Sequence, residues 1–378
     1  MTMSSTAVAS GPSAAVFGGS ERARVACVYK PNRGLGVALR DMSGIRFIRM
    51  AEALARRGHM VDLVLDRGRV LSSNLREVPF TSVRWADYDV IKTFFHSGFS
   101  FLVAAGGVDH PFIVSKLGSV VGRDQTAGVH FYGAVRERLF EVEEAIARTS
   151  RFVTVLTDES ARLWRREYGS TPPLLQVPTG VDAQIPPPGP NPYRRLGIDG
   201  SVAFFAGNIY TGAQQPEVNE LWQDRLNRIG RRLQQYGVRV VAAGNGDTDR
   251  IDAAAVLHVG SLEASAIWDW QRYAHVGLVL AQGPAQDNES SKIYYYLRSE
   301  LPVVCERPVP NAWLVQHTGH GAVVDYDDVE AFARAAAELA RRPPTASGVA
   351  QYMVDCHSWD VRAATYDRVF DAARRAHG

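Results

Sequence analysis

The stretch from Asp287 to Glu306 joins a polar loop to the start of a helix and carries a lysine at the junction. Ser290 and Ser291 stand at that junction, and serine is favoured at the N-cap of a helix. The free N–H groups of a helix start carry partial positive charge and readily receive phosphate groups. Lys292 falls in the first turn, where its charge opposes the helix dipole unless an anion lies nearby. The stretch predicts a diphosphate site, with an ordinary capped helix and a surface lysine as the alternative.

The first half of the chain alternates strand-like and helix-like segments. Residues 24–29 have the pattern of a buried strand, and apolar residues at helical spacing then mark a helix that ends at Gly58. Residues 59–65 form the next strand, which completes a strand–loop–helix–strand unit of a parallel sheet. Further strands are expected at 90–91, 112–114 and 152–156, with a long helix at 135–149.

The second half repeats this alternation after a proline-dense segment. Residues 185–190 cannot continue a helix or a central strand, so they are predicted to link two domains. Beyond the linker, strands are expected at 202–206, 238–243, 256–259, 276–280 and 303–304. Two such units predict two doubly wound, Rossmann-like α/β domains. Because ligands lie at the carboxyl ends of parallel strands, the two domains are expected to face a central cleft.

Five short segments resemble, in their order and spacing, the GT-B glycosyltransferases, and in particular the large glycosyltransferase family 4. They are VPTGVD at 177–182, FAGN at 205–208, VAAGNG at 241–246, VGSL at 259–262 and HSW at 357–359, and LPVV at 301–304 completes the donor segment. The resemblance covers most of the chain. It implies the GT-B fold and the transfer of a sugar from a nucleoside-diphosphate sugar, with UDP sugars favoured.

The same segments imply the division of the chain into domains. Residues 22–178 correspond to an acceptor-binding domain and residues 179–356 to a domain that binds the nucleotide-sugar donor. Residues 357–378 correspond to a C-terminal helix that crosses back to the first domain. Residues 1–21 are rich in Ser, Ala and Gly and are expected to form a disordered leader.

Two positions depart from the retaining members of family 4. Those enzymes carry two acidic residues eight positions apart, the second about seven positions before the proline. Counting back from Pro302, these positions are Asp287 and Tyr295, so the second carboxylate is missing. Asn208 stands where an arginine is usual. Both features are similar to the bacterial glucuronosyltransferase of xanthan-type polysaccharide assembly, which inverts the anomeric centre and has a lysine at the position of Lys292.

The resemblance also implies the contacts of the donor. It places the diphosphate on Lys292 and on the helix end at Ser290 and Ser291, and it gives Glu289 a ribose or sugar hydroxyl. The remaining donor-binding residues that it implies are Gly207, Asn208, Gly244, Gly260 and Leu262. Gly34 and Gly36 in the first loop are candidates for acceptor or phosphate contact, but no third glycine completes a dinucleotide fingerprint.

An inverting transfer needs one general base that takes the proton of the acceptor hydroxyl. We expect it in the first domain, where the candidates are Asp124, His130, His96 and Asp41. Asp124 and His130 lead because their loop at 118–133 is long and rich in glycine and polar residues, which is typical of functional loops. An inverting transfer does not strictly require a divalent metal, and the donor segment from Asp287 to Glu306 carries no Asp-x-Asp metal motif, so we expect neither a metal nor another cofactor.

Composition limits the partners and the compartment. The chain has 378 residues and a formal net charge of +2, which gives no reason to expect nucleic acid as a partner. Cys27, Cys305 and Cys356 lack metal spacing, which predicts free thiols in a reducing compartment. No apolar run approaches the roughly 20 residues that span a bilayer, and the first twenty residues make a poor signal peptide. We therefore expect a cytoplasmic protein.

Arginines are spread along the chain, mostly in helical patterns that include Arg46 and Arg49. Such patterns are typical of solvated helix faces. Contact with an anionic membrane surface or with a phosphorylated acceptor is the alternative. Peripheral contact with the inner face of a membrane therefore stays open.

Two other functions fit the same architecture. One is a nucleotide-sugar 2-epimerase, although the acidic residues that such enzymes place around the sugar are not found in this sequence. The other is a catalytically silent protein that binds nucleotide sugars, and the missing second carboxylate favours it.

Overall fold

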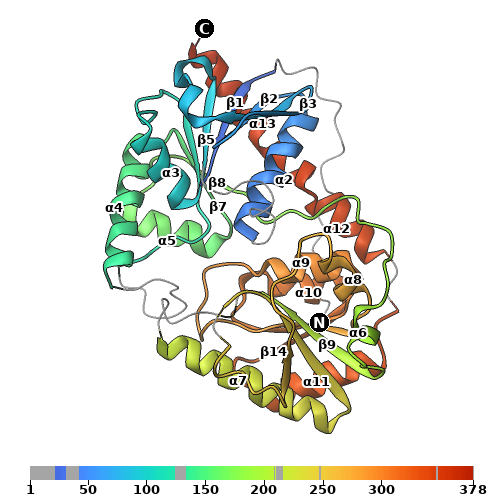
Figure 1. The fold of residues 1–378 in the computed structure, drawn as a ribbon. Coiled ribbons are helices and arrows are strands. Elements are labelled where there is room, and N and C mark those ends of the chain that lie inside the picture. Colours follow the sequence, from blue (N-terminus) through green and yellow to red (C-terminus); the bar gives the residue numbers. More distant parts are fainter. Residues whose placement is uncertain are drawn as a thin grey trace, which may run out of the picture.

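The protein has two α/β domains, one above the other in Figure 1. The structure is a computed structural model, and it describes residues 22–30, 42–123, 133–207, 209, 216–246, 248–345 and 348–377. The leader expected at 1–21 lies outside the described residues. Among the candidate site residues, Gly34, Gly36, Asp41, Asp124, His130 and Asn208 also lie outside them.

Within the described residues, the first sheet has eight strands in the order β3-β4-β2-β1-β5-β6-β7-β8. They are β1 (Arg24–Val28), β2 (Met60–Leu65), β3 (Arg69–Ser72), β4 (Leu75–Pro79), β5 (Val90–Phe94), β6 (Ile113–Lys116), β7 (Phe152–Val155) and β8 (Leu174–Gln176). All neighbouring strands pair in parallel except β3 and β4. The central strands are buried on both faces, as the continuous apolar runs of the sequence indicate.

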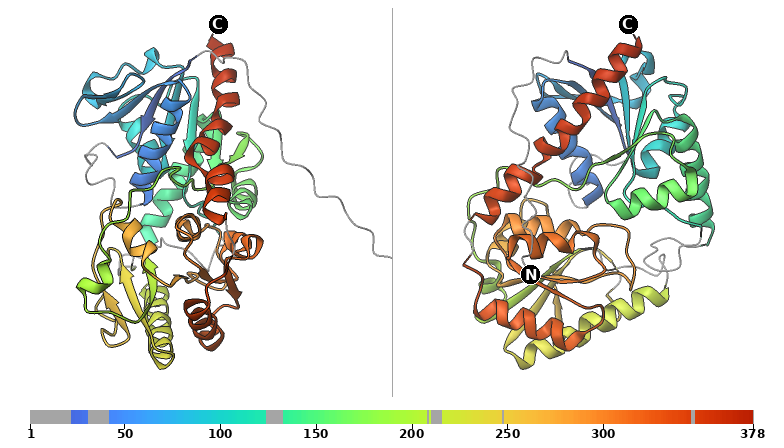
Figure 2. Two further views of the ribbon diagram at one scale, coloured as in Figure 1. Left: turned by 90° about the vertical axis from the view of Figure 1, so that its right-hand side faces the viewer. Right: turned by 180° about the vertical axis from the view of Figure 1, so that it is seen from behind.

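Helices cover both faces of this sheet. On one face lie α2 (Met42–Arg56) and α13 (Trp359–His377), whose apolar residues share one core with β1 and β2. Figure 2 shows α13 running along the back of the first domain. On the other face lie α3 (Phe95–Ala104), α4 (Gly133–Thr149) and α5 (Asp158–Tyr168). Two short 3-10 turns, Phe80–Ser82 and Trp85–Asp87, precede β5.

In the part of the second domain that the structure describes, the sheet has six parallel strands in the order β11-β10-β9-β12-β13-β14. They are β9 (Ser201–Ala206), β10 (Val238–Ala243), β11 (Val256–His258), β12 (Val276–Val279), β13 (Val303–Glu306) and β14 (Gly321–Val324). This is the doubly wound order of a Rossmann domain, in which the strand order reverses between β9 and β12. The two doubly wound domains expected from the sequence are therefore confirmed.

Helices also enclose the second sheet. The face away from the first domain carries α7 (Pro216–Gln235) and α11 (Val329–Arg341) (Figure 1). The opposite face carries α6 (Pro192–Arg195), α8 (Ile267–Arg272), α9 (Ser291–Arg298), α10 (Trp313–Thr318) after the turn Pro310–Ala312, and α12 (Val349–His357). Within the described part of the chain, no helix is long and apolar enough to cross a membrane.

The chain crosses between the domains twice, and the two crossings touch. Val181, on the way to the second domain, bridges to Ser358, on the way back. A Cβ at Gly180 would lie 2.5 Å from the ring of Trp359, so only glycine lets the two segments approach this closely. The return segment then continues into α13, whose Tyr366 and Phe370 lie in the core of the first domain.

The strands that the sequence did not predict are β3, β4, β8 and β14. All four are short, and β3, β8 and β14 lie at sheet edges or next to them, where their side chains are exposed or half-buried. Such strands carry little of the continuous apolar signal by which central strands are recognised.

Candidate active site

A cavity of about 630 Å³ lies between the domains and is lined by residues of both. In the first domain its wall follows the ends of β1 and β5, with Tyr29, Phe95 and His96. In the second domain it follows the end of β9, with Gly207, and the start of α9, with Lys292. Both places are points where the strand order of a sheet reverses, which is where open α/β sheets bind ligands.

Ser290, at the N-terminus of α9, lines this cavity with a side-chain hydroxyl that makes no hydrogen bond to the described residues. Ser290 is the N-cap residue, as the sequence predicts, but its side chain makes no capping bond. Its backbone N–H donates to Asn311 Oδ1 at 2.7 Å, and Asn311 Nδ2 donates to the Ser290 carbonyl at 2.9 Å. Ser290 is only 8% exposed, and its Oγ has no hydrogen-bond partner among the described residues. A buried polar group without a partner is costly, so this hydroxyl favours a polar ligand.

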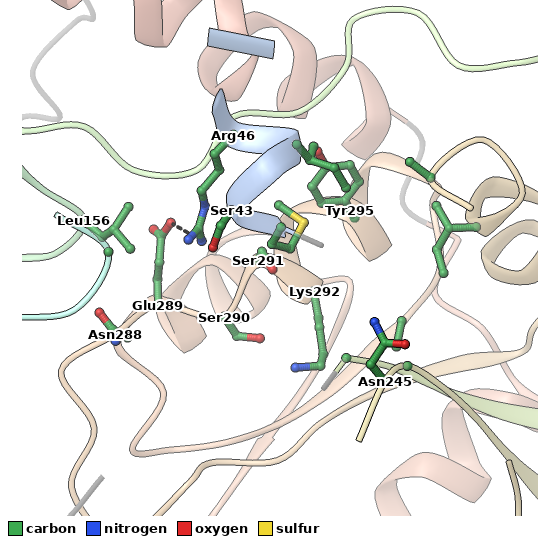
Figure 3. A pocket seen from close by; sticks show the side chains of 18 of the residues that line it. Ser43, Arg46, Leu156, Asn245, Asn288, Glu289, Ser290, Ser291, Lys292 and Tyr295 are labelled. Carbon is green, nitrogen blue, oxygen red and sulfur yellow. Dashed lines mark ion pairs between the residues drawn. The ribbon is translucent and has the colours of Figure 1, made fainter. Parts of the chain in front are cut away.

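Lys292 lies beside this helix end, deep in the second domain's wall of the cavity (Figure 3). Its Nζ stands 4.9 Å from the centre of the Phe205 ring. Burial lowers the pKa of Lys292 to about 8, because a desolvated ammonium group is disfavoured. An anion in the cavity would compensate for the lost hydration of the ammonium group. Lys292 and the helix end together suit a phosphate group.

Gly207 is the position on which the placement of Lys292 depends. A Cβ at this residue would lie 2.6 Å from Lys292 Cε and 2.9 Å from its Nζ. We predict that Gly207→Ala pushes the ammonium group aside and weakens UDP binding about tenfold, the size of one lost charged hydrogen bond. The melting temperature should change little, because the flexible end of a lysine can move. Gly200→Ala is the matched control, since the nearest atom to its Cβ is 3.9 Å away; equal affinities of the two variants would contradict the prediction.

The lowered pKa of Lys292 predicts that nucleotide binding weakens in alkaline solution. The pKa of the free group is about 8, and a bound diphosphate should raise it because an anion favours the ammonium form. Binding then takes up a proton, and affinity for UDP should fall by up to about tenfold per pH unit above pH ~8. Titration calorimetry across this range measures the fall. A constant affinity would rule out a phosphate contact by Lys292.

Glu289 lies at the junction of the two domains. Its Oε1 accepts the Thr179 backbone N–H at 2.6 Å and lies 3.9 Å from Arg46 of α2. Its Oε2 accepts the Tyr294 hydroxyl at 2.9 Å, and the side chain is only 1% exposed. Both oxygens therefore already bind protein groups. A contact between Glu289 and a substrate hydroxyl stays a prediction.

The other donor residues predicted from the sequence lie at the same end of the second sheet. Gly244 and Leu262 line the cavity. Gly260 has a φ of +78°, which favours glycine, and its carbonyl accepts the Gly244 N–H at 2.9 Å. Of the predicted catalytic residues, the structure describes His96, which lines the cavity from the first domain. Within the described residues, no group of three or more His, Cys, Asp or Glu side chains could hold a metal ion.

Arg46 and Arg49 are interpreted from the sequence as solvated, and for Arg46 that interpretation is wrong. Arg46 is largely buried: its Nη2 lies 2.7 Å from Thr179 Oγ1, and its side chain is 11% exposed. Arg49 stays half-exposed but pairs with Asp182 at 3.0 Å. The physical reason is that the second domain and the junction cover this end of α2. No periodicity within the helix could reveal that contact.

The donor loop also reaches the first domain through residues that the sequence did not single out. Thr157, the N-cap residue of α5, and Ser160 of α5 donate to the Asp287 carbonyl at 2.5 Å and 3.2 Å. Asn288 Nδ2 donates to Ser119 Oγ at 2.5 Å, and Asn288 Oδ1 has no hydrogen-bond partner in the part of the chain that the structure describes. The loop that shapes the donor wall therefore also holds the two domains together.

Comparison with known proteins supports the fold. No protein-family model and no curated sequence matches the chain. Among solved structures, the sucrose-phosphate synthase of Thermosynechococcus elongatus matches with a TM-score of 0.70 at 14% identity, over 94% of this chain and 100% of that one. Anabaena HepE in complex with UDP and glucose matches with a TM-score of 0.63 at 11% identity, over 93% and 100% of the two chains.

A third match is the UDP-forming α,α-trehalose-phosphate synthase of Burkholderia vietnamiensis. Its TM-score is 0.62 at 11% identity, over 95% of this chain and 99% of that one. At such identities the likeness shows the fold and nothing finer. The chain has the GT-B fold that the sequence resemblance implied.

Proposed function

We propose that this protein is a glycosyltransferase that moves a sugar from a nucleoside-diphosphate sugar to an acceptor nucleophile. The observation that carries this proposal is the pairing of the Lys292 ammonium, a half-buried group that lines the cavity, with the open N-terminus of α9. The pairing lies in an interdomain cavity large enough for a nucleotide sugar. The Ser290 hydroxyl at the same helix end, which has no partner among the described residues, adds a third group suited to a phosphate.

This pairing fits the chemistry of glycosyl transfer. As the bond between the anomeric carbon and the diphosphate breaks, negative charge grows on the leaving diphosphate. Preorganised positive groups stabilise such developing charge most strongly where water is excluded. Lys292 and the α9 N–H groups supply that charge without a metal. Because the second carboxylate of the retaining pattern is replaced by Tyr295, we propose inversion at the anomeric centre.

The donor we propose is a UDP sugar. Two of the structural neighbours are a complex with UDP and glucose and a UDP-forming synthase, which supports UDP over other nucleotides. The acceptor nucleophile is a hydroxyl or similar group on a small molecule, a lipid carrier or a glycan.

The test is to incubate the purified protein with UDP, GDP, dTDP and ADP sugars. A transferase should slowly release free nucleotide, because water replaces the missing acceptor, and release should be faster with acceptor extracts. Conversion of one sugar into another would identify an epimerase instead. Binding without release, even with extracts, would identify a catalytically silent protein. Lys292→Met is the control for release by a contaminant.

A further inference from the structure

His96 forms a tight pair with a buried acid at the first domain's side of the cavity. Its Nε2 lies 2.7 Å from Glu143 Oε1 of α4. The His96 side chain is 13% exposed and lines the cavity, whereas the Glu143 side chain is fully buried. A buried carboxylate needs donors, so the proton of a neutral His96 belongs on Nε2. Nδ1, the other ring nitrogen, is then the acceptor.

The partner acid is itself fixed in place. The Val121 backbone N–H donates to Glu143 Oε1 at 3.1 Å and to Oε2 at 3.3 Å. Nδ1 of His96, by contrast, has no hydrogen bond within the described part of the chain. The histidine therefore has one nitrogen held by the protein and one left for a ligand in the cavity.

The backbone around His96 is held in a strained and crowded conformation. Phe95 has a φ of +62°, which is rare for a bulky residue and costs about 1–3 kcal/mol. Two glycines allow it: a Cβ at Gly98 would lie 2.5 Å from the Val28 carbonyl, and one at Gly118 would lie 2.9 Å from the Phe95 ring. The first turn of α3 thus packs tightly on the end of β1, and His96 has little freedom to move.

We propose that His96 is the general base of the transfer and that Glu143 is the residue that positions it; this inference rests on the proposed function. Nδ1 takes the proton of the acceptor hydroxyl while that oxygen bonds to the anomeric carbon. The bond from the anomeric carbon to the diphosphate breaks, and its electron pair leaves with the diphosphate. Glu143 then stabilises the imidazolium through Nε2.

The other described groups around the cavity are less suited to this role. Asp182 is paired with Arg49 at 3.0 Å, and both oxygens of Glu289 accept protein hydrogen bonds. His96 is the one histidine among the described residues that line the cavity. It follows β5 beside β1, where the first sheet reverses its order, so it faces the donor wall from the opposite domain.

Two variants separate the roles. His96→Ala should lower kcat for nucleotide release by about 10²–10⁴-fold, the usual contribution of a general base. Its affinity for UDP should stay within about twofold of the wild type, and added imidazole should partly restore its activity. Glu143→Leu removes the acceptor of the Nε2–H, so the ring and its tautomer are no longer held. Its kcat should fall at least about tenfold with KM for the donor unchanged. Glu143→Gln, whose amide oxygen can take the place of Oε1 and accept from both His96 and Val121, should restore much of that loss. Glu144→Gln, on the same helix but exposed, should match the wild type.

Nitrogen NMR of the histidine side chains gives a readout that does not depend on turnover. The wild type should show His96 with its proton on Nε2, and Glu143→Leu should show a mixture of the two tautomers because no acceptor is left for the Nε2–H. A proton on Nδ1 of His96 in the wild type would overturn the inference. So would a His96→Ala variant whose kcat is unchanged, or whose donor affinity falls as much as its kcat. A wild type that releases no nucleotide from any sugar would overturn the proposed function and this inference together; normal turnover in His96→Ala would overturn this inference alone.

Discussion

Lys292→Met is expected to weaken binding of UDP and of the UDP sugar by at least about tenfold, because a charged hydrogen bond at a buried site contributes about 1.5–3 kcal/mol. Methionine keeps the length and the apolar stem that lies against Phe205, so the change removes the charge and little else. Nucleotide release should fall further than binding, since the ammonium group matters most as charge develops on the leaving diphosphate. Calorimetry with UDP and a release assay measure the two effects.

Lys30→Met is the matched control for this prediction. Lys30 also lines the cavity, but on the wall of the first domain at the end of β1. Its loss should leave the affinity for UDP unchanged. If both lysine variants lose UDP binding equally, the general charge of the cavity, rather than the end of α9, attracts the nucleotide. If neither does, Lys292 has no part in donor binding.

Glu289→Gln is expected to lower the free energy of unfolding by about 3–5 kcal/mol, the cost of removing one partner from a buried ion pair. The lost charge lies among buried cations: Arg46 and Lys116 both lose a favourable interaction with Glu289. Burial already lowers the pKa of Lys116 to about 7, which shows how poorly this region solvates positive charge. Urea unfolding measures the change.

Glu144→Gln is the control for stability. Glu144 pairs with Arg123 at 2.7 Å, but both side chains are largely exposed, and exposed pairs contribute about 1 kcal/mol or less. If the two variants lose similar amounts of unfolding free energy, the interactions of Glu289 with Arg46 and Lys116 stabilise the protein no more than a surface ion pair does. Unchanged stability together with reduced UDP affinity in Glu289→Gln would instead support the predicted substrate contact.

The fold could be predicted from sequence to the extent that its signals are local. Continuous apolar runs marked the central strands β1, β2, β9, β10 and β12, because strands buried on both faces need apolar residues throughout. The proline-dense segment at 185–190 was predicted to link the domains; the structure has the crossing just before it, at Val181, and Gly189 already bonds to Asp269 of the second domain. The edge strands β3, β8 and β14 were missed, since exposed or half-exposed residues carry no such pattern, whereas the edge strand β11 was predicted. The helix end at Ser290 was predictable for the same local reason, because capping preference depends on neighbouring residues.

The sequence by itself determined the two doubly wound domains, the start of α9 and the presence of a lysine in its first turn. Only the tertiary structure decided that Arg46 is buried, that Glu289 joins the domains, that Gly207 makes room for Lys292 and that Glu143 holds His96. Each of these pairs residues that are far apart in the chain and meet only when the sheets and their covering helices pack. The desolvation and the ion pairing of these side chains depend on neighbours that are distant in the chain. The local periodicity of the sequence therefore cannot predict them.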